Sequence, residues 1–114
     1  MENIKNTILC IDDDNDTCEL VGFMFNETGY KVTSCSTAKE GLSYAQKGGF
    51  AAIILDNRFE ETSGLEICQE IRTFDKVTPI IFFSGKAYQK DKDEGLAIGA
   101  NAYLVKPHDL EILT

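Results

Sequence analysis

The sequence contains no tryptophan, one histidine and two prolines. No stretch approaches the roughly 18 consecutive apolar residues of a bilayer-spanning helix. The first six residues are largely polar, so we expect no signal peptide there. Basic residues are also scarce, since 11 Lys and Arg stand against 19 Asp and Glu, and the net charge is −8. This acidity argues against nucleic acid or an anionic membrane as a partner of this chain.

The cysteines lack the spacing of a metal or redox site. The four cysteines, Cys10, Cys18, Cys35 and Cys68, form no Cys-x-x-Cys pair, and only one histidine accompanies them. A zinc site is therefore not expected. Two of the four lie on apolar segments, one in a strand-like run and one on a helical face. We predict free, buried thiols and a cytoplasmic protein.

Length and composition favour a single domain over residues 1–114. The chain has 43% hydrophobic and 26% charged residues, close to the averages for globular proteins. This length is sufficient for a hydrophobic core without disulfides or metals. No internal repeat, low-complexity segment or linker interrupts it.

Hydrophobic periodicity predicts alternating strands and helices. Short strand-like runs occupy residues 7–11, 30–35, 50–55, 80–83 and 102–105. Helical patterns follow each run, and the last, which starts near Asp109, has only about a turn and a half before Thr114. Four of the five runs are rich in apolar residues, as strands buried on both faces are. The alternation predicts an α/β fold, a doubly wound parallel sheet with helices on both faces. Residues 30–35 include Lys31, which suits an edge strand.

Capping signals and the spacing of apolar residues predict where the helices begin and which side of each faces the core. Ser, Thr or Asp followed three residues later by Glu predicts three capping boxes, at Asp16–Glu19, Thr37–Glu40 and Ser63–Glu66. In the first helix the pairs Leu20/Met24 and Val21/Phe25 are expected on the inner side. The helix over residues 87–98 is the weakest, because it is highly charged and Gly95 interrupts it. Only Tyr88, Leu96, Ala97 and Ile98 are expected to pack there.

Polar residues follow the strands at four places. Asp12 and Asp13 come after the first strand, Asp56 after the third, Ser84 after the fourth and Lys106 after the fifth. The carboxyl ends of parallel strands share one edge of the sheet, so these side chains are expected to converge. Neighbouring carboxylates resist joint ionisation and favour a cation, and Mg²⁺ suits hard oxygen ligands. A metal, an ammonium and a carboxylate together are the equipment of phosphoryl transfer to a carboxylate.

Each of these residues also has a simpler interpretation. Asp12 to Asp14 could cap the first helix, and Asp56 could start a turn. Ser84 could be an ordinary strand-end hydroxyl, and Lys106 could be solvated. It is much less probable that all of these simple roles hold at once than that any one does.

Four blocks of sequence resemble the receiver domain of bacterial response regulators, over nearly the whole chain. They are Ile8-Leu-Cys-Ile-Asp-Asp-Asp14, Ile53-Ile-Leu-Asp56 with Gly64 eight residues on, Phe83-Ser84-Gly85, and Gly99-Ala-Asn-Ala-Tyr-Leu-Val-Lys-Pro107. Each block alone is weak to moderate, but their order, spacing and strand-end placement are together highly specific. The resemblance implies the strand order 2-1-3-4-5.

The resemblance also implies roles for the candidate residues. Asp56 would accept a phosphoryl group from the phosphohistidine of a sensor histidine kinase or a phosphotransfer protein. Asp12, Asp13, Asp56 and the backbone carbonyl of Arg58 would hold Mg²⁺. Lys106 would contact the phosphoryl oxygens, Ser84 would move toward the phosphoryl group, and Tyr103 would turn inward. The Lys106–Pro107 peptide would be cis. A homodimer would use the face of the fourth helix, fifth strand and fifth helix.

The chain departs from the family pattern without losing a catalytic group. Glu60 replaces the usual proline after Asp56, which suggests a looser loop, and Ser63 replaces a common aspartate. Arg58 and Lys86 are basic at the two variable positions that flank the phosphoryl group, and His108 stands where an aromatic residue is usual. The short fifth helix suggests a domain taken from a longer regulator. The alternatives are a phosphorylation-independent interaction module and, with less support, a metal-dependent phosphatase.

Overall fold

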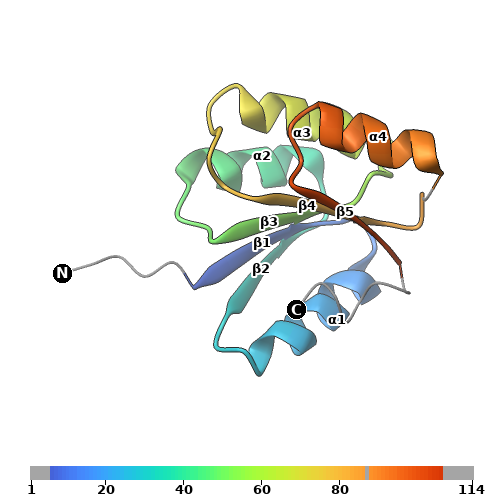
Figure 1. Ribbon diagram of the computed structural model, residues 1–114. Helices are drawn as coiled ribbons and strands as arrows, with labels where there is room; N and C mark the ends of the chain where they lie inside the picture. The colour runs from blue at the N-terminus through green and yellow to red at the C-terminus, as the bar shows by residue number, and fades with distance from the viewer. Residues whose placement is uncertain (1–5, 87, 107–114) are drawn as a thin grey trace.

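Five parallel strands form one sheet in the order β2-β1-β3-β4-β5 (Figure 1). The computed structural model describes residues 6–86 and 88–106. The strands are β1 (Thr7–Ile11), β2 (Lys31–Cys35), β3 (Ala52–Leu55), β4 (Ile80–Ser84) and β5 (Ala102–Val105). The predicted strands and strand order are confirmed, with β2 at one edge. The third strand begins two residues later than the sequence pattern suggested.

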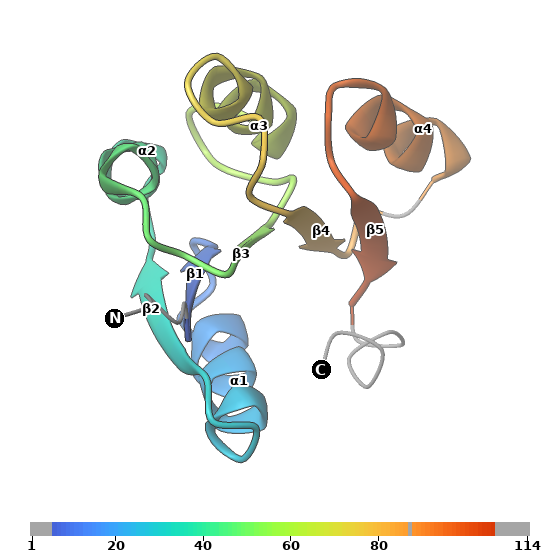
Figure 2. The ribbon, with the colours of Figure 1, turned by 60° about the vertical axis from the view of Figure 1, so that its left-hand side comes forward.

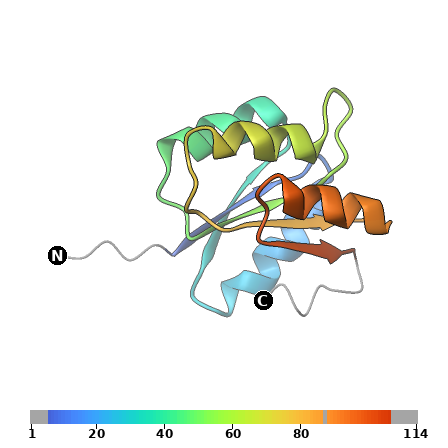
Figure 3. The same cartoon turned by 45° about the horizontal axis from the view of Figure 1, so that its top comes forward.

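Helices cover both faces of the sheet. The described residues form α1 (Asn15–Asn26), α2 (Ala38–Lys47), α3 (Gly64–Arg72) and α4 (Gln89–Ala97). Figures 1 and 2 show α2, α3 and α4 on one face and α1 on the other, and Figure 3 shows the same layers from above. The doubly wound α/β architecture is therefore confirmed. Among the described residues, none of the helices has the length and apolarity needed to cross a bilayer.

The core consists of two layers of buried side chains, one on each face of the sheet. The larger lies under α2, α3 and α4 and includes Leu9, Leu55 and Phe82. The smaller lies against α1 and includes Cys10, Val21, Phe25, Ile54 and Phe83. Because side chains alternate along a strand, β1 and β3 supply both layers. This double burial explains why their sequences are continuously apolar.

At two of the three expected capping boxes the predicted N-cap residue begins the helix, and its hydroxyl binds the amide three residues on. The Thr37 hydroxyl accepts a hydrogen bond from the Glu40 amide, and the Ser63 hydroxyl accepts one from the Glu66 amide. The first expectation is wrong. Asp14 caps α1, since its carboxylate accepts from the Asp16 amide and from the Thr17 hydroxyl. Helix α1 therefore begins earlier than a box at Asp16 would allow.

The inner face of α1 is shifted from the predicted one. Thr17, Cys18, Val21 and Phe25 are buried, whereas Leu20 is 43% exposed. Thr17 and Cys18 occupy the remaining buried positions of α1, although a search for strongly apolar residues at helical spacing does not select threonine or cysteine.

Helix α4 packs differently from the prediction. Tyr88 is 78% exposed and Leu96 is 48% exposed, while Asp91 and Gly95 are buried. A Cβ atom on Gly95 would lie 3.0 Å from the Tyr103 ring and 3.1 Å from the Phe82 ring. The glycine therefore permits close approach of α4 to β4 and β5 rather than interrupting the helix. The expected cis peptide before Pro107, His108 and the short fifth helix lie outside the described residues.

Candidate functional site

Three carboxylates converge at the carboxyl ends of β1 and β3. Carboxylate oxygens of Asp12, Asp13 and Asp56 all lie within 4.8 Å of one another. Asp12 and Asp56 are buried and Asp13 is exposed. The parallel pairing of Ile11 with Leu55 brings the two loops together, because each acidic residue follows a paired strand end. The predicted convergence is confirmed for these three side chains.

Lys106 brings the positive charge to this cluster. Its ammonium lies 2.8 Å from an Asp12 oxygen and 3.7 Å from an Asp56 oxygen. The Lys106 amide donates to the Ser84 carbonyl, which continues the β4–β5 ladder past Val105 and fixes where the side chain starts. Lys106 is therefore not a solvated surface lysine, the simpler role considered from the sequence.

The electrostatics of the pair follow from burial and proximity. Burial raises the pKa of Asp12 to about 6, against the hydrogen bonds from Lys106 and from the Asp14 amide. Burial opposes the charge of Lys106 too, but its hydrogen bond to Asp12 and the nearby Asp56 charge raise the pKa of the ammonium. Asp12 and Lys106 are therefore both ionised at neutral pH. The Lys106 ammonium supplies one positive charge to a cluster of three carboxylates, so the cluster favours a further cation.

The donor set fits a hard divalent cation. Three carboxylates supply the anionic oxygen ligands that Mg²⁺ prefers, and one of them is exposed to water. Among the described residues no other group of three His, Cys, Asp or Glu side chains could hold a metal. All four cysteines are free and buried, as predicted.

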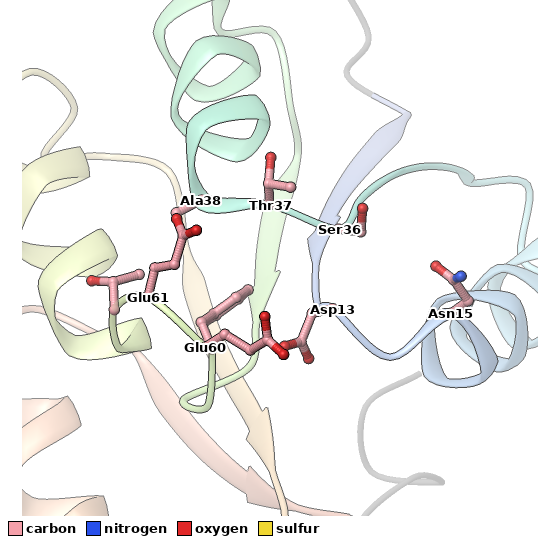
Figure 4. A pocket seen from close by; sticks show the side chains of 9 residues that line it. Asp13, Asn15, Ser36, Thr37, Ala38, Glu60 and Glu61 are labelled. Carbon is pink, nitrogen blue, oxygen red and sulfur yellow. The ribbon is translucent and has the colours of Figure 1, made fainter.

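A hollow of about 400 Å³ opens beside the cluster. It is lined by Asp13, Asn15, Ser36, Thr37, Ala38, Phe59, Glu60, Glu61 and Thr62. Figure 4 shows the side chains of Asp13 and Glu60 pointing toward one another. The exposed acid of the cluster therefore faces an open, polar space that a solvated cation can reach.

Ser84 and Tyr103 lie beside the cluster on the two neighbouring strands. The buried Ser84 hydroxyl accepts a hydrogen bond from the Lys86 amide at 3.1 Å. The Tyr103 ring is 9% exposed and stacks on Phe82 at 5.2 Å. Its hydroxyl donates to the Lys86 carbonyl. Burial raises the pKa of the Tyr103 hydroxyl, so the phenol is neutral at physiological pH.

Sequence reasoning missed two buried polar side chains in this region. Asn57 is 1% exposed, and its amide group donates to the Tyr103 hydroxyl at 3.2 Å. Asp91 in α4 is fully buried, accepts from the Tyr88 amide and lies 3.8 Å from the Lys86 ammonium. The sequence carries little signal for either, since Asn after Asp56 resembles a turn and Asp91 stands in a charged run.

Arg58 lies at the start of the loop that follows Asp56. It pairs with Ser63 in an isolated antiparallel bridge, which closes the loop before α3. The side chain of Arg58 is exposed. The part of its backbone carbonyl in metal binding stays a prediction, as does the effect of Glu60 on the loop.

Comparison with known proteins agrees with the fold. A family model described as the response regulator receiver domain matches residues 8–114. The chain belongs to this family. It is 42% identical over 105 residues to the regulatory protein VanR of Enterococcus faecium, covering 91% of this chain and 45% of VanR. The chain spans about half the length of the curated relatives it matches.

Solved receiver structures superpose closely. The chemotaxis protein CheY4 of Vibrio cholerae matches with a TM-score of 0.87 at 31% identity, covering 96% of this chain and 93% of CheY4. The BeF3-activated receiver domain of DrrB matches with a TM-score of 0.85 at 25% identity, covering 96% and 92% of the two chains. This protein is therefore a receiver domain of two-component signalling, as its sequence blocks suggested.

Proposed function

We propose that this receiver domain is a phosphorylation switch in which Asp56 accepts a phosphoryl group. The donor is the phosphohistidine of a sensor histidine kinase or of a phosphotransfer protein. Mg²⁺ assists, and the product changes the domain's conformation and its binding to partners. The domain acts on itself, through its own phosphorylation and dephosphorylation, rather than on an outside substrate.

One arrangement carries this proposal, namely Asp56 beside both a carboxylate cluster and an ammonium. The Asp56 carboxylate is 6% exposed, lies in the group of three acids and is 3.7 Å from the Lys106 ammonium. An incoming phosphoryl group carries negative charge and needs cationic partners on its oxygens. The ammonium supplies one such partner. A divalent ion held by Asp12, Asp13 and Asp56 would neutralise further charge on the phosphoryl oxygens.

The chain's own groups account for the rest of the step. A lone pair on an Asp56 oxygen forms the new O–P bond as the P–N bond of phosphohistidine breaks, and the leaving imidazole takes up a proton. Lys106 moves its interaction from carboxylates toward the phosphoryl oxygens. The Ser84 hydroxyl, which is buried at the end of the adjacent strand, would hydrogen-bond the new group.

The test is intact mass after incubation with acetyl phosphate, with and without Mg²⁺. We expect an adduct of about 80 Da, the mass of a phosphoryl group transferred to a carboxylate. The adduct should require both Mg²⁺ and Asp56, and it should be absent from Asp56→Asn. Asp75→Asn is the matched control, because Asp75 lies at the opposite end of the sheet beside Thr78. Normal labelling of Asp56→Asn would refute the assignment.

The interaction-module alternative makes a different prediction for the same experiment, namely no adduct on a folded wild-type protein. The assembled cluster and its lysine give that alternative no support. The homodimer through α4 and β5 stays a prediction, as does the cytoplasmic location. Exposed Tyr88 and Leu96 are available on α4 for such a contact.

A further inference from the structure

Asn57 is expected to lower the stability of the folded protein at its position. Its side chain is buried, and its carbonyl oxygen has no hydrogen-bond partner among the described residues. An unpaired buried acceptor is destabilising, and a leucine of similar size would avoid that cost. Packing alone therefore favours an apolar side chain here. The amide must be explained by the hydrogen bond that its nitrogen makes.

That nitrogen joins the phosphoacceptor loop to the tyrosine of β5. The Asn57 Nδ2 donates to the Tyr103 hydroxyl at 3.2 Å, and the Asn57 backbone amide donates to an Asp56 carboxylate oxygen at 2.8 Å. One residue thus contacts both the phosphoacceptor side chain and Tyr103. The start of α3 packs closely against this residue, because a Cβ on Gly64 would lie only 2.8 Å from the Asn57 Cα.

The Tyr103 hydroxyl connects in turn to the start of α4. It donates to the Lys86 carbonyl, while the Lys86 ammonium lies 3.8 Å from the buried Asp91 carboxylate. Asp91 also accepts from the Tyr88 amide at the first turn of α4. The hydroxyl therefore has hydrogen bonds both to the Asp56 loop and to the segment that leads into α4, and the Ser84 side chain interacts with it as well.

We infer that Asn57 is a positioning residue that holds the Tyr103 hydroxyl on the Lys86 carbonyl before any phosphoryl group is present. Tyr103 is buried, and a donor from the Asp56 loop contacts its hydroxyl there. This contact involves no phosphoryl group, so we expect the tyrosine part of the switch to be preset in this chain. Phosphorylation then has to move Ser84 and α4 but not Tyr103. The consequence for switching rests on the proposed function, whereas the contact itself does not.

The test follows Tyr103 in the unphosphorylated 114-residue chain. We would incorporate 3-fluorotyrosine, record ¹⁹F NMR spectra of the four tyrosines, and assign Tyr103 from the Tyr103→Phe variant. In the wild type the Tyr103 signal should stay in place when beryllofluoride, a phosphoryl analogue, is added with Mg²⁺. In Asn57→Leu it should shift toward the signal of exposed Tyr88 and return when beryllofluoride is added.

Three further readouts separate positioning from a structural role. Asn57→Leu should not lower the thermal midpoint, because it removes an unpaired carbonyl. Asn57→Leu should weaken beryllofluoride binding about three- to tenfold, which corresponds to the net free energy of one hydrogen bond. In a Tyr103→Phe background it should have no effect on that affinity. A Tyr103 signal and an affinity that are both unchanged in Asn57→Leu would overturn the inference.

A further measurement keeps Asn57 in place, so its outcome does not depend on whether an Asn57 variant folds. The ¹⁵N-detected side-chain amide of Asn57 should exchange slowly in the wild type and faster in Tyr103→Phe. Equal exchange in both would also overturn the inference. If acetyl phosphate and beryllofluoride both fail on the wild type, the proposed function fails. The spectra of the free protein still decide the role of Asn57.

Discussion

The Lys106 ammonium lies 2.8 Å from Asp12 but 3.7 Å from Asp56. The lysine is thus bound mainly to a carboxylate of the Asp12, Asp13 and Asp56 cluster. Its contact with the phosphoacceptor is looser. A phosphoryl group on Asp56 would offer the ammonium better acceptors than the Asp56 carboxylate does. The lysine can therefore respond to phosphorylation by a small shift between neighbouring oxygens.

Replacing Lys106 should slow phosphorylation without abolishing it. Lys106→Ala removes the ammonium but leaves Asp56 and the other carboxylates in place. We expect the rate of adduct formation with acetyl phosphate to fall about 100-fold, the usual loss when one charge-stabilising donor is removed. The conformational response to beryllofluoride should also be largely lost. Lys39→Ala, on the exposed face of α2, is the control and should behave as wild type.

Cation binding should weaken as the solution is acidified through pH 6. The pKa of Asp12 is raised to about 6, chiefly by burial, so below that pH a proton occupies a ligand oxygen. The apparent affinity for Mn²⁺, measured by the loss of its free EPR signal, should fall up to about tenfold per pH unit below 6. Asp12→Asn should bind more weakly but with a flatter pH dependence. An equal slope in wild type and variant would contradict this ligand role.

The same raised pKa has an opposite effect on the metal-free protein. The folded state binds the Asp12 proton more tightly than the unfolded state does, whose carboxyl titrates near 4. The free energy of unfolding should therefore rise as the pH falls from about 6 to about 4, and this gain should be smaller in Asp12→Asn. Saturating Mg²⁺ should remove the gain, since the cation stabilises the folded state at the higher pH. Urea unfolding across this range measures both effects.

Gly64 should tolerate no side chain. A Cβ atom there would lie 2.1 Å from the Asp56 carbonyl oxygen and 2.8 Å from the Phe82 ring. Gly64→Ala should lower the free energy of unfolding by more than about 3 kcal/mol and reduce the adduct on Asp56, because relief of the clash moves the Asp56 loop. Gly22→Ala in α1 is the matched control. No atom lies within 4 Å of a Cβ there, so it should stabilise by about 0.5–1 kcal/mol.

Sequence alone could predict the site because its residues follow strands. Once the runs before Asp12, Asp56 and Lys106 are identified as parallel strands, their ends must meet at one edge. The burial of Asn57 and Asp91 could not be predicted in this way. It depends on Gly64 and Gly95 bringing helices close to the sheet, which is a tertiary effect. Without that information, a short polar residue in a loop or in a highly charged helix has the same sequence pattern as one exposed to water.

The prediction for the inner face of α1 was correct for Val21 and Phe25 but wrong for Leu20. Leu20 fits an apolar pair at helical spacing, but Thr17 and Cys18 occupy the buried side. The sequence also left the start of the helix open, because several acidic residues at positions 12–16 could each have been the cap. Capping propensity is the same for adjacent aspartates, so it does not identify the one that caps the helix. In the structure Asp12 binds Lys106 instead, which excludes it as the cap.

Arg72 should contribute to stability at the edge of the sheet opposite the phosphorylation site. Its guanidinium donates to the backbone carbonyls of Gly99, Asp75 and Thr78 and to the side chain of Asn101. Arg72→Lys keeps the charge but loses the planar fork that reaches all four acceptors. We expect the free energy of unfolding in urea to fall by about 2 kcal/mol, because several partly buried carbonyls lose a charged donor.

The location of Arg72 makes its effect separable from function. Its partners lie before β4 and β5, whereas Ser84 ends β4 and Lys106 follows β5. The adduct with saturating acetyl phosphate should therefore be the same in Arg72→Lys and wild type at a temperature where both are folded. Exposed Lys90→Gln, the control, should change stability by less than about 0.5 kcal/mol. A loss of labelling in folded Arg72→Lys would show that this edge is coupled to Asp56, and unchanged stability would show that the four hydrogen bonds contribute little.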